Sequence, residues 1–189
     1  MAKAARISSL TEFEGKFLCL DRIGYRDRRG RERTWEAAMR RGNRGAVEVI
    51  PLLHPSDRLL LIQQYRPPMD AVVLEFPAGL IDAGEAPENT AVREVREETG
   101  YTGTVRWISS PTCSSPGMTG ETVHLAIMDI DETAPQNLTP EPQLEDGEDI
   151  EVLCVPRRGL AELLRTKVAE GFRVDSRTAA YAIGLGVTW

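Results

Sequence analysis

Apolar positions along the chain fall into many short runs and a few longer helical patterns. Short apolar or alternating runs that are bounded by Gly, Pro or polar turns predict strands. We expect strands at 17–25, 31–39, 46–53, 58–65, 71–76, 104–109, 122–130 and 150–155, and helices at 86–99, 157–169 and 175–186. Strands mixed with few helices, in an order that does not repeat, favour an α+β or α/β sandwich over a Rossmann array.

The first 44 residues form a short, arginine-rich segment ahead of the main apolar pattern. Its two expected strands are joined by a polar turn at 27–30, and the polar stretch at 41–46 predicts a loop into the rest of the chain. The segment is too short to form a core alone. We therefore expect a small N-terminal β extension at 1–44 and one full-size domain at 45–189.

The helix expected at 86–99 has two chemically different faces. One face is apolar, whereas Glu94, Glu97 and Glu98 lie together on the other. Gly100 suits the position just past the helix end. Three carboxylates this close repel one another, so they form either a solvated acidic face or a site for a hard cation, which prefers oxygen ligands.

Charge narrows the classes of partner. A net charge of −6 argues against general nucleic-acid binding. Nine arginines lie between Arg22 and Arg44, and acidic residues cluster at 82–98 and 141–151. Such a chain could bind an anionic ligand with one region and a cation with the other, although most of these charges are expected only to solvate the surface.

Other sequence signals indicate a reducing compartment and no membrane partner. The start of the chain has no apolar signal region, and no apolar run approaches the roughly 20 residues that cross a bilayer. Cys19, Cys113 and Cys154 are widely spaced, which favours reduced thiols over disulfides or a zinc site. We therefore expect a cytoplasmic protein.

The spacing of polar residues at 79–101 is more specific than any single charge. This segment resembles the Nudix box, G-x5-E-x7-R-E-U-x-E-E-x-G-U, at every fixed position, with Tyr101 where the box usually has an aliphatic residue. The residues at the fixed positions are Gly79, Glu85, Arg93, Glu94, Glu97, Glu98 and Gly100. The resemblance implies a Nudix fold, an α/β/α sandwich around a mixed sheet, and hydrolysis of a nucleoside diphosphate linked to another group.

The resemblance also implies how the box is used. Glu94 and Glu98 would be the main metal ligands, Glu97 a further ligand or support, and the backbone carbonyl of Ala78 another ligand. Two or more Mg²⁺ or Mn²⁺ ions are expected. Arg93 would orient Glu97 from one helical turn away, and Glu85 would support the helix or the site.

Segments outside the box resemble one branch of the family. Pro116 follows the box by about 15 residues, as in the ADP-ribose pyrophosphatases of the ADP-sugar diphosphatase branch. The matching segments are 33–41, 63–69, 74–82, 114–121 and 145–152. This similarity implies hydrolysis of ADP-ribose, or another ADP-sugar, to AMP and a sugar phosphate such as ribose 5-phosphate. It also implies a homodimer whose subunits each contribute one aromatic residue around the adenine, here Trp35 and Phe17.

The same similarity suggests roles for polar residues. In this branch the base that activates water comes from an acidic loop, where Glu148 is the best match beside Glu145, Asp146 and Asp149, although most of this cluster could be only a solvated turn. Trp35 could instead pack in a strand, and Arg40 could be an ordinary surface arginine. The remaining substrate-binding candidates are Arg40, Arg66, Glu36, Glu75 and Met118.

Two other functions are compatible with these residues. The chain could be another Nudix enzyme, acting on a different nucleotide sugar or an oxidised nucleoside diphosphate. It could also be a non-catalytic domain that senses ADP-ribose, but such a domain would not need the full set of carboxylates.

Overall fold

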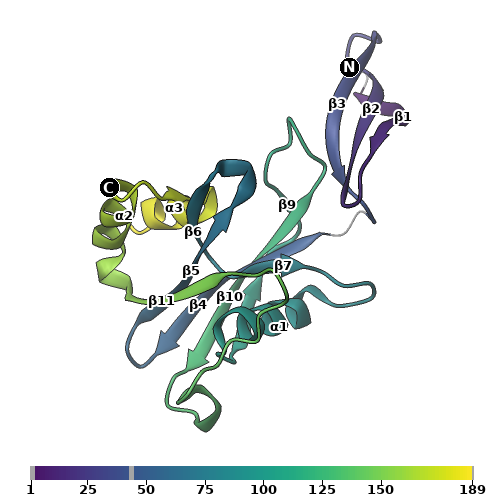
Figure 1. Cartoon of the computed structure of the whole chain (residues 1–189). Coiled ribbons are helices and arrows are strands. Elements are labelled where there is room, and N and C mark those ends of the chain that lie inside the picture. Colours follow the sequence, from purple (N-terminus) through teal and green to yellow (C-terminus); the bar gives the residue numbers. More distant parts are fainter. Residues whose placement is uncertain (1–2, 43–44, 189) are drawn as a thin grey trace.

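The chain folds into two sheets, the smaller one standing apart from the main body (Figure 1). The computed structural model describes residues 3–42 and 45–188. Within these ranges the smaller, N-terminal sheet has the order β1-β2-β3 and is antiparallel. Its strands are β1 (Ala5–Glu14), β2 (Leu18–Arg26) and β3 (Glu32–Arg40).

The turn between β2 and β3 confirms the hairpin that the sequence predicts at 27–30. The carboxylate of Asp27 accepts hydrogen bonds from the backbone N–H groups of Arg29 and Arg31, at 2.8 and 3.0 Å. Gly30 has a φ of 81°, a left-handed conformation that glycine adopts without strain. The N-terminal sheet meets the main body where the Ala38 N–H donates to the carbonyl of Met118, at 2.9 Å.

The larger, central sheet is mixed, as the sequence predicts. Its path is β12-β6-β5-β4-β10-β8, with β11 beside β5, β7 beside β4 and β9 beside β10. The β10–β4 and β12–β6 pairs are parallel and the others antiparallel. The strands are β4 (Ala46–His54), β5 (Arg58–Arg66), β6 (Ala71–Glu75), β7 (Ala78–Leu80), β8 (Thr104–Ile108), β9 (Thr112–Cys113), β10 (Thr122–Asp131), β11 (Ile150–Pro156) and β12 (Arg173–Val174).

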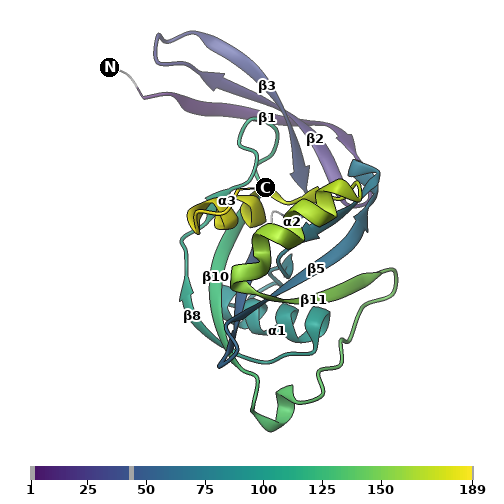
Figure 2. The same ribbon diagram turned by 90° about the vertical axis from the view of Figure 1, so that its left-hand side faces the viewer.

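Helices cover both faces of the central sheet (Figure 2). Helix α1 (Pro87–Thr99) buries Ala91 and Val95 against Val47 and Val49 of β4. On the other face lie α2 (Leu160–Ala169) and α3 (Ser176–Gly184), whose buried residues join a second core around Phe76. Burial of these two apolar layers supplies the main force for folding. The α+β class with helices on both sides of a mixed sheet is therefore confirmed.

Some elements differ from the sequence-based prediction. The stretch from 157 begins as a 3₁₀ turn and becomes α2 only at Leu160. Strands β1, β7, β9 and β12 were not predicted. Residues 43 and 44 of the expected 41–46 loop lie outside the described part of the chain. In the described part, no helix is long and apolar enough to span a bilayer.

Candidate active site

Helix α1, which carries several of the site residues, starts at a proline and is terminated by a glycine. Pro87 occupies the first turn, where its missing N–H costs nothing, and Gly100 ends the helix with a φ of 77°. A side chain at Gly100 would also collide with the backbone of Pro140 and Glu141. Gly100 is therefore required both for its conformation and for the close approach of the segment that leads to β11.

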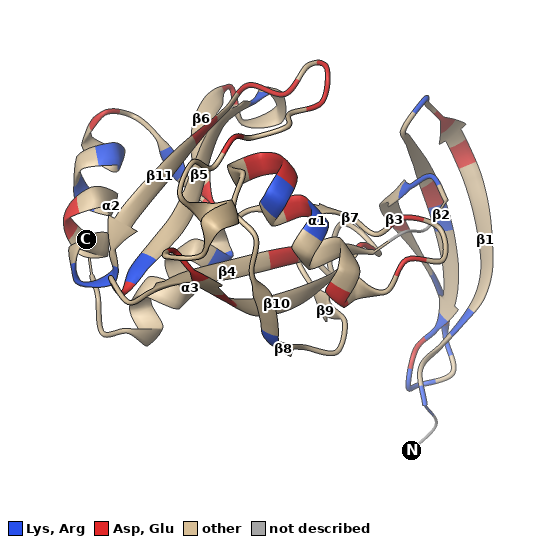
Figure 3. Ribbon diagram, turned by 90° about the horizontal axis from the view of Figure 1, so that it is seen from below, with Lys and Arg blue, Asp and Glu red and all other residues tan. Residues whose placement is uncertain are grey.

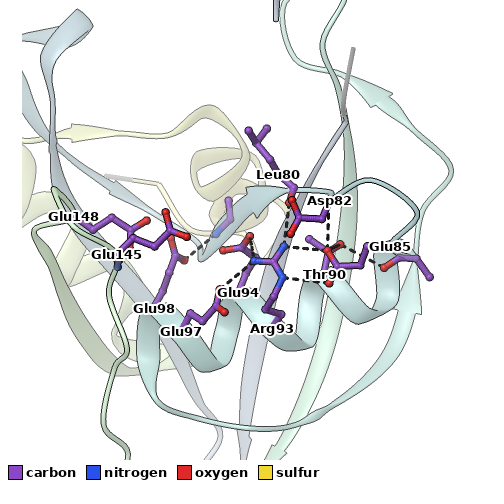
Figure 4. Close-up of polar contacts among 12 residues, drawn as sticks. Leu80, Asp82, Glu85, Thr90, Arg93, Glu94, Glu97, Glu98, Glu145 and Glu148 are labelled. Atoms are coloured by element: carbon purple, nitrogen blue, oxygen red, sulfur yellow. Dashed lines mark hydrogen bonds and ion pairs between the residues drawn. The ribbon is translucent and has the colours of Figure 1, made fainter. Parts of the chain in front are cut away.

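An acidic cleft of about 320 Å³ lies between β7, α1 and the loop before β11. Figure 3 shows acidic residues gathered on α1, and Figure 4 shows their side chains. Carboxylates therefore come together from the neighbouring β7–α1 segment and from a loop that lies about 50 residues further along the chain. The cleft, which we call the acidic cleft, is lined by Ala78, Gly79, Leu80, Asp82, Arg93, Glu94, Glu97, Glu98, Glu145 and Glu148.

Arg93 is the cation that holds the helix carboxylates together (Figure 4). Its Nε and Nη2 donate to the two oxygens of Glu85, at 3.1 and 3.0 Å. Its Nη1 donates to Glu94 at 2.7 Å and to Glu97 at 3.0 Å, and Nη2 also reaches the carbonyl of Leu80. These bonds lower the pKa of Glu85 to about 2, mainly through Arg93 itself. Glu85 thus anchors Arg93 and the helix and does not line the acidic cleft.

Glu98 is buried, which the helical pattern alone did not predict. Only 4% of the residue is exposed, and its Oε2 accepts a hydrogen bond from the Ala78 N–H at 3.0 Å. Burial raises the pKa of Glu98 to about 8, and burial also raises the pKa of Glu94. A side chain on Gly79 would collide with the carboxylate of Glu94. The glycine therefore lets β7 pass close to the carboxylates of α1.

The loop before β11 brings Glu148 to the acidic cleft. Its carboxylate accepts from the backbone N–H of Glu145, at 2.8 Å, so the two acidic residues form one turn. The negative charge of Glu148 contributes to the raised pKa of both Glu94 and Glu98. The structure therefore places Glu148 near the box carboxylates, although it lies about 50 residues further along the chain.

The donor set of the acidic cleft fits a hard divalent cation. Carboxylate oxygens are the preferred ligands of such ions, and burial makes Glu94 and Glu98 costly to ionise without a cation nearby. Within residues 3–42 and 45–188, no three such side chains converge on a single point. The reason is that Arg93 holds Glu94 and Glu97, while the Ala78 N–H holds Glu98.

A second cleft, of about 280 Å³, adjoins the acidic cleft along Ala78–Leu80. We call it the arginine cleft, because Arg40, Arg66 and Arg177 line it. Arg40 pairs with Glu121 at 2.7 Å, and Arg66 pairs with Glu75 at 2.9 Å. Burial raises the pKa of Glu75. Arg40, Arg66 and Glu75, which the sequence pointed to separately, thus share one surface.

The two expected aromatic residues do not come together within one chain. Trp35 is half exposed beside Glu36 and Gly117, with its indole N–H bonded to the Gly117 carbonyl at 3.0 Å. In the β2–β3 hairpin Trp35 lies opposite Ile23, whereas Phe17 lies at the other end, next to Leu18. The strand rise places these positions roughly 20 Å apart. Both side chains are exposed, so Trp35 is not a packed core residue in this structure.

Several cleft residues were not predicted from the sequence. Asp82, Glu121, Arg177 and Glu48 line the two clefts but were not named as site residues. Asp82 and Glu121 lie in the segments 74–82 and 114–121 that resemble the family branch, and a different signal marks Glu48. It is a carboxylate inside an otherwise apolar strand, and charged residues are seldom fully buried unless they are paired. Met118 lies in the loop before β10, where it is exposed and bonds to β3 through its carbonyl.

Comparisons with known proteins agree with this geometry. The family model described as NUDIX domain matches residues 42–171. An ADP-sugar pyrophosphatase from Mus musculus is 38% identical over 180 residues, which cover 91% of this chain and 83% of the mouse protein. An ADP-ribose pyrophosphatase from Saccharomyces cerevisiae is 36% identical, over 90% of this chain and 77% of the yeast protein. A crystal structure of an ADP compounds hydrolase matches with a TM-score of 0.66 and 21% identity, covering 87% of this chain and 84% of that one, which shows the shared fold.

Proposed function

The chain belongs to the Nudix family of pyrophosphohydrolases, and on that premise we propose that it hydrolyses ADP-ribose, or a related ADP-sugar, to AMP and a sugar phosphate such as ribose 5-phosphate. The observation that carries the proposal is the meeting of the box carboxylates and Glu148 in one cleft beside the arginine cleft. The similarity to an ADP-sugar pyrophosphatase of mouse and an ADP-ribose pyrophosphatase of yeast supports the choice of an ADP-linked substrate.

Nudix hydrolases use a divalent metal ion, and we propose two or more Mg²⁺ or Mn²⁺ ions here. Glu94 and Glu98 would be the main ligands, with Glu97 and the carbonyl of Ala78 as further ligands. The ions would neutralise the diphosphate and lower the pKa of a bound water. The fit rests on the oxygen donors that line the acidic cleft, with Arg93 as the neighbouring positive charge.

The remaining steps are assigned to side chains of the chain itself. Arg40 and Arg66 would pair with diphosphate oxygens, because guanidinium groups bind such oxygens in a bidentate manner. Glu148 would accept a proton from water as the water oxygen bonds to phosphorus. The bond from that phosphorus to the bridging oxygen then breaks, and two phosphate monoesters leave. Arg93 would act as a positioning residue, since it holds Glu94 and Glu97.

We propose a homodimer, because one chain does not complete the adenine site. Trp35 could stack on one face of the base, but Phe17 of the same chain lies too far away to cover the other face. Glu36, Glu75 and Met118 would contact the base or its ribose. The N-terminal sheet exposes a set of large apolar side chains that a second copy could cover. They are Ile7, Leu10, Phe13, Phe17, Leu18, Leu20 and Trp35.

A product analysis tests the proposed reaction. The protein is incubated with ADP-ribose and Mg²⁺, and AMP and ribose 5-phosphate are separated by chromatography. We expect both products in equal amounts and no products from the Glu98→Gln variant. AMP at no more than the level of that variant would refute the proposal. A parallel panel of ADP-glucose, GDP-mannose, NADH and 8-oxo-dGDP distinguishes an ADP-sugar enzyme from a Nudix enzyme with another substrate.

Light scattering tests the homodimer separately. At micromolar concentration we expect the mass of two chains, and a single-chain mass would contradict the shared adenine site. Replacing Phe13 with Ser in the exposed apolar set should shift the mass towards one chain. The matched variant Leu138→Ser, which changes an exposed apolar residue far from that sheet, should leave the mass unchanged.

A further inference from the structure

The arginine cleft contains a buried carboxylate that has no role in the reaction as proposed above. Glu48 of β4 lines this cleft, and only 3% of the residue is exposed. Its Oε2 accepts a hydrogen bond from Nη1 of Arg177 at 2.7 Å. Its Oε1 has no hydrogen-bond partner among the described residues. Buried polar atoms are seldom left unpaired, so this oxygen indicates a ligand group that can donate a hydrogen bond.

Arg177 is itself held in place, which fixes the carboxylate of Glu48. Its Nη2 donates to the hydroxyl of Ser114 at 2.5 Å, and its Nη1 lies 3.4 Å from the carboxylate of Asp175. Asp175 also caps the start of α3 by accepting from the Arg177 backbone N–H. One oxygen of Glu48 therefore binds Arg177, and the other has no partner within residues 3–42 and 45–188.

The charges of the cleft favour a hydroxyl group over a phosphate at this position. Each arginine that lines the cleft has a carboxylate partner within 2.9 Å, and the arginine beside Glu48 is Arg177, whose charge Glu48 and Asp175 already offset. These pairs are Arg40–Glu121, Arg66–Glu75 and Arg177–Glu48. Burial raises the pKa of Glu48 to about 8, and a sugar hydroxyl can pair with its free oxygen in either protonation state because a hydroxyl both donates and accepts, whereas the ionised form repels a phosphate.

The position of Glu48 connects it to the acidic cleft. Glu48 lies opposite Ala78 in the β4–β7 pair, and Ala78 lines both clefts. A sugar joined to a diphosphate in the acidic cleft would thus lie within reach of Glu48. We propose that Glu48, held by Arg177, binds a hydroxyl of the substrate's sugar and selects for sugar-linked diphosphates. This inference rests on the proposed function, because it assumes that the acidic cleft binds the diphosphate.

Three substrates and one variant test the proposed hydroxyl contact. The first substrate is ADP-ribose. The second is the β-methyl ester of ADP, which has no terminal ribose. The third is an ADP-ribose analogue whose adenosine ribose lacks its 2′- and 3′-hydroxyl groups. The variant Glu48→Met keeps the side-chain volume and removes the acceptor. We expect it to lower kcat/KM for ADP-ribose about 10-fold, and to change kcat/KM less than two-fold for the one analogue that lacks the contacted hydroxyls. Which analogue is spared identifies the terminal or the adenosine ribose.

A second variant keeps the test valid if Glu48→Met does not fold. Arg177→Lys keeps the positive charge but cannot hold both Glu48 and Ser114, so it should show the same selective loss at about three-fold. Arg173→Lys, an exposed arginine on β12, is its matched control and should behave as wild type. An equal loss on all three substrates, or no loss on any, would overturn the proposal.

A binding measurement separates this proposal from the reaction itself. If the wild-type protein hydrolyses none of the three substrates, the proposed function fails. In that case, quenching of tryptophan fluorescence by ADP-ribose in the presence of Mg²⁺ still reports binding, because no turnover consumes the ligand. About 10-fold weaker binding by Glu48→Met, with the methyl ester or the dideoxy form unaffected, supports the hydroxyl contact. Unchanged binding of ADP-ribose rejects it.

Discussion

Replacing Arg93 with Met should destabilise the metal-free protein in a manner that depends on pH. The pKa of Glu85 falls from 4.5 to about 2 in the folded protein, mainly because of its hydrogen bonds to Arg93. At about 1.4 kcal/mol per unit, that change corresponds to at most ~3.4 kcal/mol, and solvent screening lowers it to about 2. Leaving Glu94 without its partner adds about 1 kcal/mol. We therefore expect a loss of about 3 kcal/mol at pH 7.

The pH dependence follows from the direction of the Glu85 shift. A carboxyl group whose pKa is lowered by folding adds stability above pH 4.5 and loses this contribution as the pH falls towards 2. The difference between wild type and Arg93→Met should therefore be largest above pH 4.5. It should shrink by about 2 kcal/mol as the pH falls from 4.5 to 2.

Urea denaturation in EDTA, followed by circular dichroism at several pH values, measures this difference. The matched control is Arg96→Met, which removes an exposed arginine from the same helix. We expect the control to stay within about 0.5 kcal/mol of wild type. An equal loss for the two variants, or a loss for Arg93→Met that is the same at pH 3 and pH 7, would refute the role given to Arg93.

Three further predictions follow from the geometry. Glu98→Gln should abolish turnover yet leave the metal-free protein at least as stable as wild type at pH 9. Burial raises the pKa of Glu98 to about 8, so above that pH the buried carboxylate is ionised and destabilises the wild-type fold. A clear drop in Tm of the variant at pH 9 would contradict this. Trp35→Ala should mainly raise KM, because stacking is equal in ground and transition states, and a fall in kcat at constant KM would argue against stacking. Gly100→Ala should lower the free energy of unfolding by more than about 3 kcal/mol in the same urea titration, because the added methyl group would collide with Pro140 and Glu141. Gly84 has a similar φ but open space around it, so Gly84→Ala should lower it by only about 1 kcal/mol. Equal losses would show that the contact with Pro140 and Glu141 is unimportant.

The sequence predicted the elements whose pattern is local. Short apolar or alternating runs predicted the strands from β2 to β6, and helical periodicity predicted α1, to within a few residues; β4 and β5 are buried along most of their length, whereas α1 buries one face. These patterns did not predict β1, whose residues are exposed along their whole length, or β7, which is only three residues long. Such strands are held by their neighbours, and this information is absent from their own sequence.

The same limit applies to the candidate site. The box residues were found because their spacing is local to one loop and one helix. The approach of Glu148 to that helix needed the resemblance to a family, and the pairing of Glu48 with Arg177 links residues 129 positions apart. No local pattern encodes such a contact, which depends on how α3 packs on the central sheet.

The separation of the two sheets has a consequence for how this protein could diverge. Trp35 and Phe17 belong to the N-terminal sheet, whereas the acidic cleft is built from the central sheet and α1. Under the proposed roles, a duplicated gene could remodel its N-terminal sheet around Trp35 and Phe17 and so acquire a new base preference. The carboxylates proposed to hold the metal ions and to accept the proton would be inherited intact, because none of them comes from the N-terminal sheet, whereas Arg40 at the end of β3 would have to be kept.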